Sequence, residues 1–327
     1  MVNTEELEQY RVIEAVQQEL WQQLHALPDV VGSAIGHKVM AGKDTKKVCL
    51  VLFVSKKNDL SASHPSMIFL QNLTNRGILT DVVERPHTSV PLPLIHTDEL
   101  VKLDQSRTDK FDPMIGGISC GPDVNIIKFP YSGTLGISVL RTASQELGIL
   151  SNHHVMYYDA TTKKVCQPAR TDSIFNYTGG DKLEAYMGNV TLQGIPTYVD
   201  CAVATVLEGR SATRKTLFGI KTPVTGILSR NQVAIGDQVV KSGLSSAITT
   251  GTVRYLSVSG PDGIEPNQFA IMGNDGKDFA KSGDSGSVVL KGDKVMGLLW
   301  GKNEDDGITY AMVSPIEAVL ETLGIEI

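Results

Sequence analysis

Apolar residues recur at steps of three and four along the first 27 residues, which places them on one face of a helix. Pro28 ends this run, because a proline restricts the residue before it and has no amide donor. The pattern predicts an N-terminal helix over residues 3 to 27, whose apolar stripe has to be buried against its own domain, another part of the chain or another subunit. The stripe consists of Leu7, Tyr10, Ile13, Val16, Leu20 and Leu24.

Two strand-like runs follow, at residues 30–36 and 48–54, with a turn of Gly, Lys and Asp between them. The second run is continuously apolar, which is typical of a strand covered on both faces. A polar segment separates it from a further strand candidate at residues 77–83. Together with the helix, these runs predict a small α/β domain over residues 1–100. Prolines come next and mark a linker, which we assign to residues 101–115.

The chain changes character from residue 116 onward, where short β-type runs alternate with Gly, Asn, Asp and Ser. A series of this kind favours a sandwich or a barrel. Near the end, Ser314, Pro315 and Glu317 stand in the order of an N-cap, a first-turn proline and a third helical residue, and Gly324 closes the apolar stretch behind them. This order predicts a short C-terminal helix capped by Ser314.

The composition is that of an ordinary soluble protein, since 41% of the 327 residues are hydrophobic and 20% are charged. The length suffices for two domains and argues against disorder and fibrous structure. A net charge of −6 and a pI near 5.7 give no basis for a nucleic-acid partner or an anionic membrane surface. Both would need clustered Lys and Arg.

The sequence also lacks signals for export. No stretch reaches the roughly 18 consecutive apolar residues that span a bilayer, and Glu5, Glu6 and Glu8 stand where a secretory signal carries positive charge and an apolar core. We therefore expect a cytoplasmic protein without membrane contact. Four scattered cysteines, without CxxC or Cys/His metal spacing, fit buried, reduced thiols and no metal site. They are Cys49, Cys120, Cys166 and Cys201.

The strongest chemical motif is Gly283-Asp284-Ser285-Gly286-Ser287. A serine hydroxyl becomes a nucleophile when a base takes its proton, and the oxyanion that follows needs amide donors about 3 Å away. The flanking glycines let the backbone turn tightly and bring the amides of Gly283 and Ser285 to one point. The motif predicts a nucleophile at Ser285 and an oxyanion hole. The alternative is a simple glycine turn between two strands.

Two adjacent histidines in the run LeuSerAsnHisHisVal follow a β-type stretch and offer a general base. A strand end can hold a base rigidly, and of the pair we assign this role to His154 rather than His153. The alternatives are surface or structural histidines, or a metal site, for which no third ligand is evident.

Asp200 is the third candidate, at the head of an otherwise apolar strand-like run. A buried carboxylate is costly unless it is paired. The Nδ1 proton of a histidine is a suitable partner, and the pairing sets the tautomer that base catalysis requires. The alternative is an aspartate in a turn at a strand end.

These residues occur in the order His, Asp, Ser, and the chain resembles the chymotrypsin-like serine proteases over residues 116–327. The runs LeuSerAsnHisHisVal, ValAspCysAlaVal and GlyAspSerGlySer are similar to the family's LTAAHC, DIAL and GDSGG segments. The resemblance implies a mainly β fold, a double β-barrel with a C-terminal helix, in which His154, Asp200 and Ser285 form a catalytic triad. It also implies a pocket for a small or apolar side chain, lined by Phe279, Ala280, Leu299, Trp300 and Gly301.

A closer resemblance is to the bacterial relatives of the plant narrow-leaf proteins. These combine a GTLG strand, an LSNxHV histidine segment, a GDSGS loop and an N-terminal GxGxK element, which correspond here to residues 133–136, 150–155, 283–287 and 34–38. Ala34 replaces the first glycine of the last element. The disulfides of the secreted proteases are missing and Ser287 replaces a common glycine, but neither departure removes a catalytic group.

The resemblance implies a serine endopeptidase that cuts a protein or peptide substrate through an acyl-enzyme, without a metal or an organic cofactor. The alternative is a catalytically silent binding or scaffold protein with the protease fold. An unguarded protease would damage the cytoplasm. We therefore expect residues 1–100 to form a homo-oligomer or to bind a regulatory protein, and so to limit access to Ser285.

Overall fold

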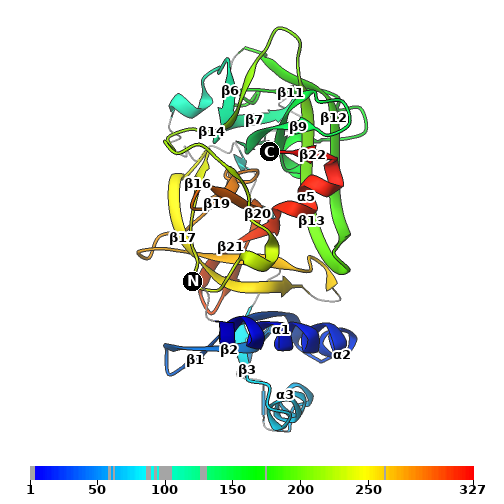
Figure 1. The fold of residues 1–327 in the computed structure, drawn as a ribbon, viewed down its shortest axis with the longest axis vertical. Coiled ribbons are helices and arrows are strands. Elements are labelled where there is room, and N and C mark those ends of the chain that lie inside the picture. Colours follow the sequence, from blue (N-terminus) through cyan, green and yellow to red (C-terminus); the bar gives the residue numbers. More distant parts are fainter. Residues whose placement is uncertain are drawn as a thin grey trace.

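The computed structural model describes residues 4–57, 60–61, 63–85, 90–91, 94–95, 105–125, 131–173, 175–260 and 263–327. The fold is mainly β, and its parts follow one another along the long axis of the molecule (Figure 1). An N-terminal region lies at one end, a closed barrel in the middle and a half-closed barrel at the other end. The helices are α1 (Thr4–Glu19), α2 (Trp21–His25), α3 (Pro65–Asn75), α4 (His153–Met156) and α5 (Ile316–Leu323), with 3₁₀ turns η2 (Gln105–Thr108) and η3 (Arg230–Gln232).

The half-closed barrel comes first in the chain. Its sheet has the strand order β22-β9-β10-β13-β12-β11-β7-β8-β5, and β6 pairs with β14 beside it. The strands are β5 (Leu94–Ile95), β6 (Met114–Gly116), β7 (Ile118–Pro122), β8 (Tyr131–Leu135), β9 (Ile137–Arg141), β10 (Leu147–Ser151), β11 (Val165–Cys166), β12 (Thr178–Leu192), β13 (Ile195–Val206), β14 (Ala212–Leu217) and β22 (Ile325–Glu326).

The second barrel closes on itself, because the order β16-β19-β20-β21-β18-β17 is completed by pairing between β16 and β17. Two barrels in sequence, followed by a C-terminal helix, form the chymotrypsin-like double β-barrel, so the predicted fold class is confirmed. Its strands are β15 (Gly226–Ile227), β16 (Gln238–Gly243), β17 (Ala247–Ser259), β18 (Gln268–Gly273), β19 (Val288–Lys291), β20 (Lys294–Asp305) and β21 (Ile308–Pro315), and β4 (Val90–Pro91) pairs with β20.

The N-terminal region continues the sheet of the second barrel. Its strands β1 (Val30–Met40), β2 (Lys43–Val54) and β3 (Thr80–Glu84) extend that sheet, because β1 pairs with β17. Gly36, from the GxGxK-like element, lies at this junction, where a Cβ would come within 2.6 Å of the Tyr255 ring. The division of the chain at residues 100 and 116 stays a prediction.

Most of the apolar stripe of the N-terminal helix packs within its own region, and Tyr10 also packs against the core of the second barrel. The predicted helix is split at Leu20 into α1 and α2, and its buried side chains Ile13, Val16, Leu20 and Leu24 join one core cluster with side chains of β1, β2 and α3. The stripe therefore does not need a second copy of the chain to cover it. The homo-oligomer stays a prediction.

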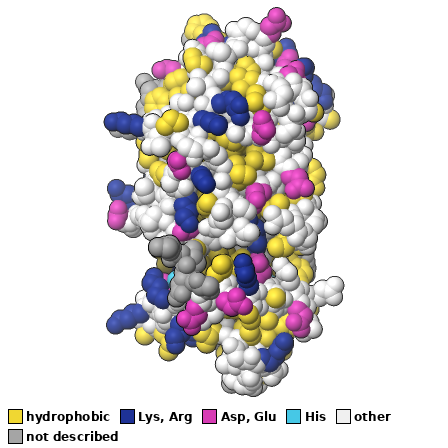
Figure 2. Space-filling model, in the orientation of Figure 1, with side chains coloured by type: hydrophobic (Ala, Val, Ile, Leu, Met, Phe, Trp, Pro, Cys, Tyr) yellow, Lys and Arg dark blue, Asp and Glu magenta, His cyan; other side chains and the backbone are white. Residues whose placement is uncertain are grey.

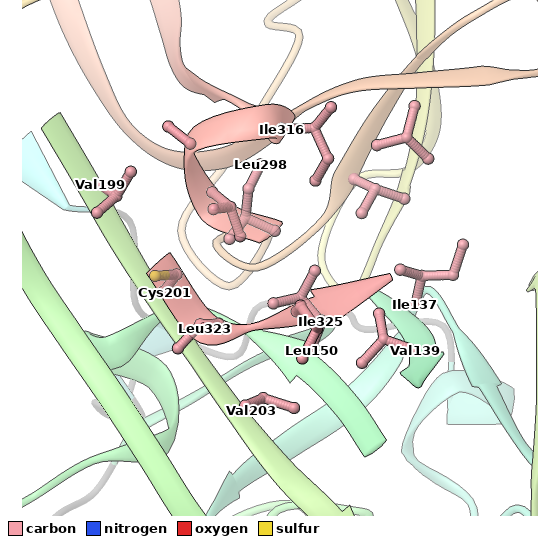
Figure 3. Close-up of a cluster of buried hydrophobic side chains, with 14 of the residues drawn as sticks. Ile137, Val139, Leu150, Val199, Cys201, Val203, Leu298, Ile316, Leu323 and Ile325 are labelled. Carbon is pink, nitrogen blue, oxygen red and sulfur yellow. The ribbon is translucent and has the colours of Figure 1, made fainter. Parts of the chain in front are cut away.

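A further core cluster joins the two barrels (Figure 3). Ile316 and Leu323 of α5 meet Leu150 and Val199 of the first barrel and Leu298 of the second. The helix ends at Gly324, which has a left-handed φ of 59°, as the sequence predicts. The predicted start of the helix is wrong by one residue, because the N-cap is Pro315 and not Ser314. Ser314 lies within β21, and its hydroxyl donates to Gln268 Oε1 at 3.0 Å.

The four cysteines are free and buried. Burial is the main cause that raises the pKa of Cys49 and of Cys120 to about 12, and it also raises the pKa of Cys166 and Cys201. Because the thiolate is the reactive form, we expect the native protein at pH 8 to give almost no reaction with a disulfide reagent such as DTNB. The denatured protein should give four equivalents. Fast reaction of the native protein would contradict the burial of these thiols.

The surface gives no sign of a basic groove on the face seen in Figure 2. Lys and Arg side chains are interspersed there with Asp and Glu and form no large patch of one sign. Within the described ranges, no helix is long and apolar enough to cross a membrane.

Candidate active site

The structure brings His154 and Asp200 together. α4 begins directly after β10, which fixes His154 at the end of a buried strand, and Asp200 lies on β13 with none of its surface exposed. The His154 amide donates to Asp200 Oδ1 at 3.2 Å, and His154 Nδ1 forms a hydrogen bond with Oδ2. Asn152 adds a third contact, because its side-chain amide donates to the Asp200 carbonyl at 2.6 Å.

This pairing determines the chemistry of the imidazole. An ionised carboxylate only accepts hydrogen bonds, so Nδ1 of His154 carries the proton and Nε2 keeps its lone pair in the neutral ring. Nε2 is buried and has no hydrogen-bond partner among the residues that the structure describes. An imidazole in this state can accept a proton at Nε2.

Residues 281–287, named the nucleophile loop after the predicted role of Ser285, form the last part of the connection from β18 to β19 and turn at two glycines. Gly283 and Gly286 have φ values of 96° and 93°, in the left-handed region that glycine favours. A Cβ on Gly286 would come within 2.1 Å of Ser151 Oγ and 2.2 Å of the Thr134 carbonyl oxygen. Gly286 is therefore required by close packing as well as by the turn, and Gly283 by its positive φ.

Thr134, from the GTLG strand, holds this loop from the first barrel. Its hydroxyl donates to the Gly283 carbonyl and its amide to the Ser285 carbonyl, both at 2.8 Å. The Asp284 carbonyl accepts from the Ser287 amide at 3.0 Å and from the Ser287 hydroxyl at 2.6 Å. Because a trans peptide places its N–H opposite its C=O, the Ser285 amide points out of this turn. That orientation suits an oxyanion donor.

Ser285 itself is fully buried, and its hydroxyl donates to the Trp300 carbonyl at 3.0 Å. His154 and Ser285 are not hydrogen-bonded to each other, since Nε2 of His154 has no hydrogen-bond partner within the described part of the chain. Such contacts often tighten only when substrate binds. The roles of His154, Asp200, Gly283 and Ser285 stay predictions.

A buried ion pair behind Ser285 was missed by the sequence reasoning. Lys241 Nζ lies 3.2 Å from Asp284 Oδ2, and both side chains are fully buried. Asp284 also accepts the amides of Ser245 at 2.9 Å, Ser246 at 3.1 Å and Lys281 at 2.9 Å. Burial lowers the pKa of Lys241, and the charge of Asp284 opposes that shift. The sequence signal for a buried ion pair was the lysine within the otherwise apolar run of β16.

The predicted pocket residues are buried in the structure. Phe279, Ala280 and Leu299 belong to the core cluster of the second barrel. Trp300 packs against Tyr198 with ring centroids 5.0 Å apart and donates from Nε1 to Gln268 Oε1 at 2.7 Å. Gly301 lies on β20, where it pairs with Pro91. The pocket assignment stays a prediction.

The described residues contain no group of three or more His, Cys, Asp or Glu side chains that could hold a metal ion. His153, the other histidine of the pair, is half-buried, and its ring centroid lies 4.5 Å from that of Tyr157. Burial is the main cause that lowers the pKa of His153. Its surroundings are those of a packed side chain.

The chain is similar to a rice protein. It is 24% identical over 308 residues to Protein NARROW LEAF 1 of Oryza sativa subsp. japonica. The match covers 85% of this chain and 52% of the rice protein, so the chain spans about half the length of that relative. Residues 221–317 also match the family described as the Nal1 C-terminal domain, a range that contains Lys241 and Ser285 but neither His154 nor Asp200.

Solved protease structures are similar at low identity. Thermobifida fusca Protease A matches with a TM-score of 0.43 and 18% identity, over 65% of this chain and 97% of its own. Cellulomonas bogoriensis chymotrypsin matches with a TM-score of 0.44 and 18% identity, over 66% of this chain and 98% of its own. A glutamic acid specific serine protease matches with a TM-score of 0.46 and 15% identity, over 65% of this chain and 100% of its own.

Proposed function

We propose that the chain is a serine endopeptidase of the chymotrypsin-like class. The observation that carries the proposal is the contact between His154 and buried Asp200, which leaves Nε2 of the imidazole free to accept a proton. In the proposed reaction, Nε2 takes the proton of Ser285, and Ser285 Oγ attacks the carbonyl of the scissile peptide. The imidazolium then gives this proton to the leaving amine, and water releases the acyl group by the reverse sequence.

Neighbouring groups stabilise the two charges that form in this reaction, on the imidazolium and on the oxyanion. Asp200 stabilises the imidazolium across the Nδ1 contact. The amides of Gly283 and Ser285 are proposed to receive the oxyanion, supported by the turn that directs the Ser285 amide outward. The chemistry needs only these groups of the chain.

The competing proposal is a catalytically silent protein with the protease fold. It is favoured by the Ser285 hydroxyl, which donates to Trp300 and not to His154. A fluorophosphonate probe separates the two, because it labels only an activated serine. Intact-mass spectrometry should show one adduct on the native chain and none on Ser285→Ala. No adduct under any condition tested would favour the silent protein.

The cellular setting is part of the proposal. Four free cysteines support a reducing compartment, which we take to be the cytoplasm. The motifs at residues 133–136, 150–155 and 283–287 support kinship with the bacterial relatives of the narrow-leaf proteins. A homo-oligomer or a regulatory partner is proposed for the N-terminal region and can be tested by light scattering on the intact chain.

We expect His153→Ala to keep most of the activity. His153 is half-buried against Tyr157, whereas the described side-chain hydrogen bonds of Asp200 go to His154, so the loss of His153 should change the rate of probe labelling less than about threefold. His154→Ala is the matched control, since it removes the neighbouring ring. If His153→Ala were inactive and His154→Ala active, the assignment of the base would be wrong.

A further inference from the structure

Two short pieces of the segment between the N-terminal region and the first barrel pair with separate barrels. β4 runs antiparallel to β20 of the second barrel, and β5 runs antiparallel to β8 of the first. Two residues separate β4 from β5 in the sequence. The paired residues are Pro91 with Gly301, Val90 with Lys302, Leu94 with Ser132 and Ile95 with Tyr131.

Both partner strands also touch the nucleophile loop. On β20, the Trp300 carbonyl accepts the Ser285 hydroxyl at 3.0 Å, and the next residue is Gly301, which pairs with β4. On β8, the Thr134 amide donates to the Ser285 carbonyl at 2.8 Å, two residues beyond Ser132, which pairs with β5. The edges occupied by β4 and β5 are therefore the two edges that flank Ser285.

Covalent geometry places these edges close together. Pro91 and Leu94 are three residues apart, so their Cα atoms lie at most about 11 Å from one another. β4 and β5, which pair with different barrels, therefore lie within that span of one another. Ser285 and Asp200 are both fully buried, which agrees with a covered site.

A pair of strand edges on either side of a nucleophile is a binding site for an extended peptide. Such edges bind a peptide by adding it as a further strand, with main-chain hydrogen bonds supplying affinity. Proline favours extended backbone and lowers the entropy lost when a segment is ordered. Residues 90–95 have the sequence ValProLeuProLeuIle, in which two prolines alternate with apolar residues, so the segment is suited to bind in extended form.

We propose that β4 and β5 occupy the two edges of the substrate groove, so that the chain holds itself in an inhibited state. The proposal rests on the proposed endopeptidase function and names its ligand as an extended peptide. A tethered segment acts at an effective concentration in the millimolar range, so a free peptide competes only near that concentration. Activation then requires release of the segment from the strand edges.

The test uses the full chain with Val90→Gly, Pro91→Ser, Leu94→Gly and Ile95→Ser, which we name the open variant. We expect fluorophosphonate labelling of Ser285 at least about tenfold faster than in the native chain, since the accessible fraction rises. The matched control carries Val39→Gly and Met40→Ser at the exposed end of β1. Thermal unfolding checks that all three proteins are folded. A native chain that labels as fast as the open variant would overturn the self-inhibition.

A second measurement does not depend on catalysis. A fluorescent peptide with the sequence of residues 88–97 is titrated to millimolar concentration against the open variant carrying Ser285→Ala and against the chain carrying Ser285→Ala alone. We expect binding to the first, by fluorescence anisotropy, and at least about tenfold weaker binding to the second. No binding to the first would overturn the groove. If the peptide bound but the probe labelled Ser285 in no variant, the peptide groove would be supported and the endopeptidase function refuted.

Discussion

Ser285→Ala is expected to lower peptide hydrolysis by about a million-fold, and His154→Ala by a similar factor. The members of a triad act as a unit, so the loss of either the nucleophile or the base removes nearly all of the acceleration that they provide together. Hydrolysis of quenched fluorescent peptides by the open variant, with and without each substitution, measures the effect. The double variant should be no slower than either single one.

The matched control is Ser282→Ala. Ser282 lies three residues before Ser285 in the same loop, but it is exposed and its hydroxyl is not part of the proposed chemistry. We expect its activity to stay within about threefold of the parent. Residual hydrolysis of more than about one per cent in purified Ser285→Ala would show that Ser285 is not the nucleophile.

Lys241→Met is expected to lower the free energy of unfolding by about 3–5 kcal/mol. The substitution keeps a long apolar side chain but leaves the Asp284 carboxylate buried without its counter-charge, and an uncompensated buried charge is strongly destabilising. Because Asp284 precedes Ser285, we also expect the labelling of Ser285 to be lost. Urea unfolding followed by fluorescence gives the change in free energy.

Lys291→Met provides the comparison for this prediction. Lys291 Nζ lies 2.6 Å from Asp237 Oδ2, but 30% of the lysine side chain is exposed. Ion pairs at the surface contribute at most about 1 kcal/mol, and this half-buried pair is still partly screened by water and salt, so we expect a smaller loss than for the fully buried pair. If Lys241→Met were no more destabilising than Lys291→Met, the buried pair would not hold the nucleophile loop in place.

The elements that local sequence determines were predicted well. The continuous apolar run at residues 48–54 is fully buried in β2, between β1 and β3, as its pattern indicates. Helix α3 was passed over as a polar segment, although Pro65 at its first turn and the apolar spacing of Leu70 and Leu73 were available signals. Ser314 was misassigned because its hydroxyl found Gln268, a partner 46 residues away.

In the site, too, local sequence identified single residues but not the contacts between distant ones. His154, Asp200 and Ser285 could be selected because each lies in a short run whose residue types suit a base, a buried partner or a nucleophile. Lys241 could not be assigned to Asp284 from the sequence, because the pair forms only when β16 is brought against the nucleophile loop. The pairing of β4 with β20 is equally invisible in the sequence, since the partners are more than 200 residues apart.

The pairing of β1 with β17 has a consequence for synthesis of the chain. Ser33 and Ser259, which meet across this pairing, are 226 residues apart. At a translation rate of about 5–20 residues per second, roughly 10 to 45 s pass between the synthesis of β1 and that of β17, its second neighbour in the sheet. During that time its free edge is open to other nascent chains. Slow codons or chaperones that act on this interval should change the yield of native protein more than those that act after residue 260.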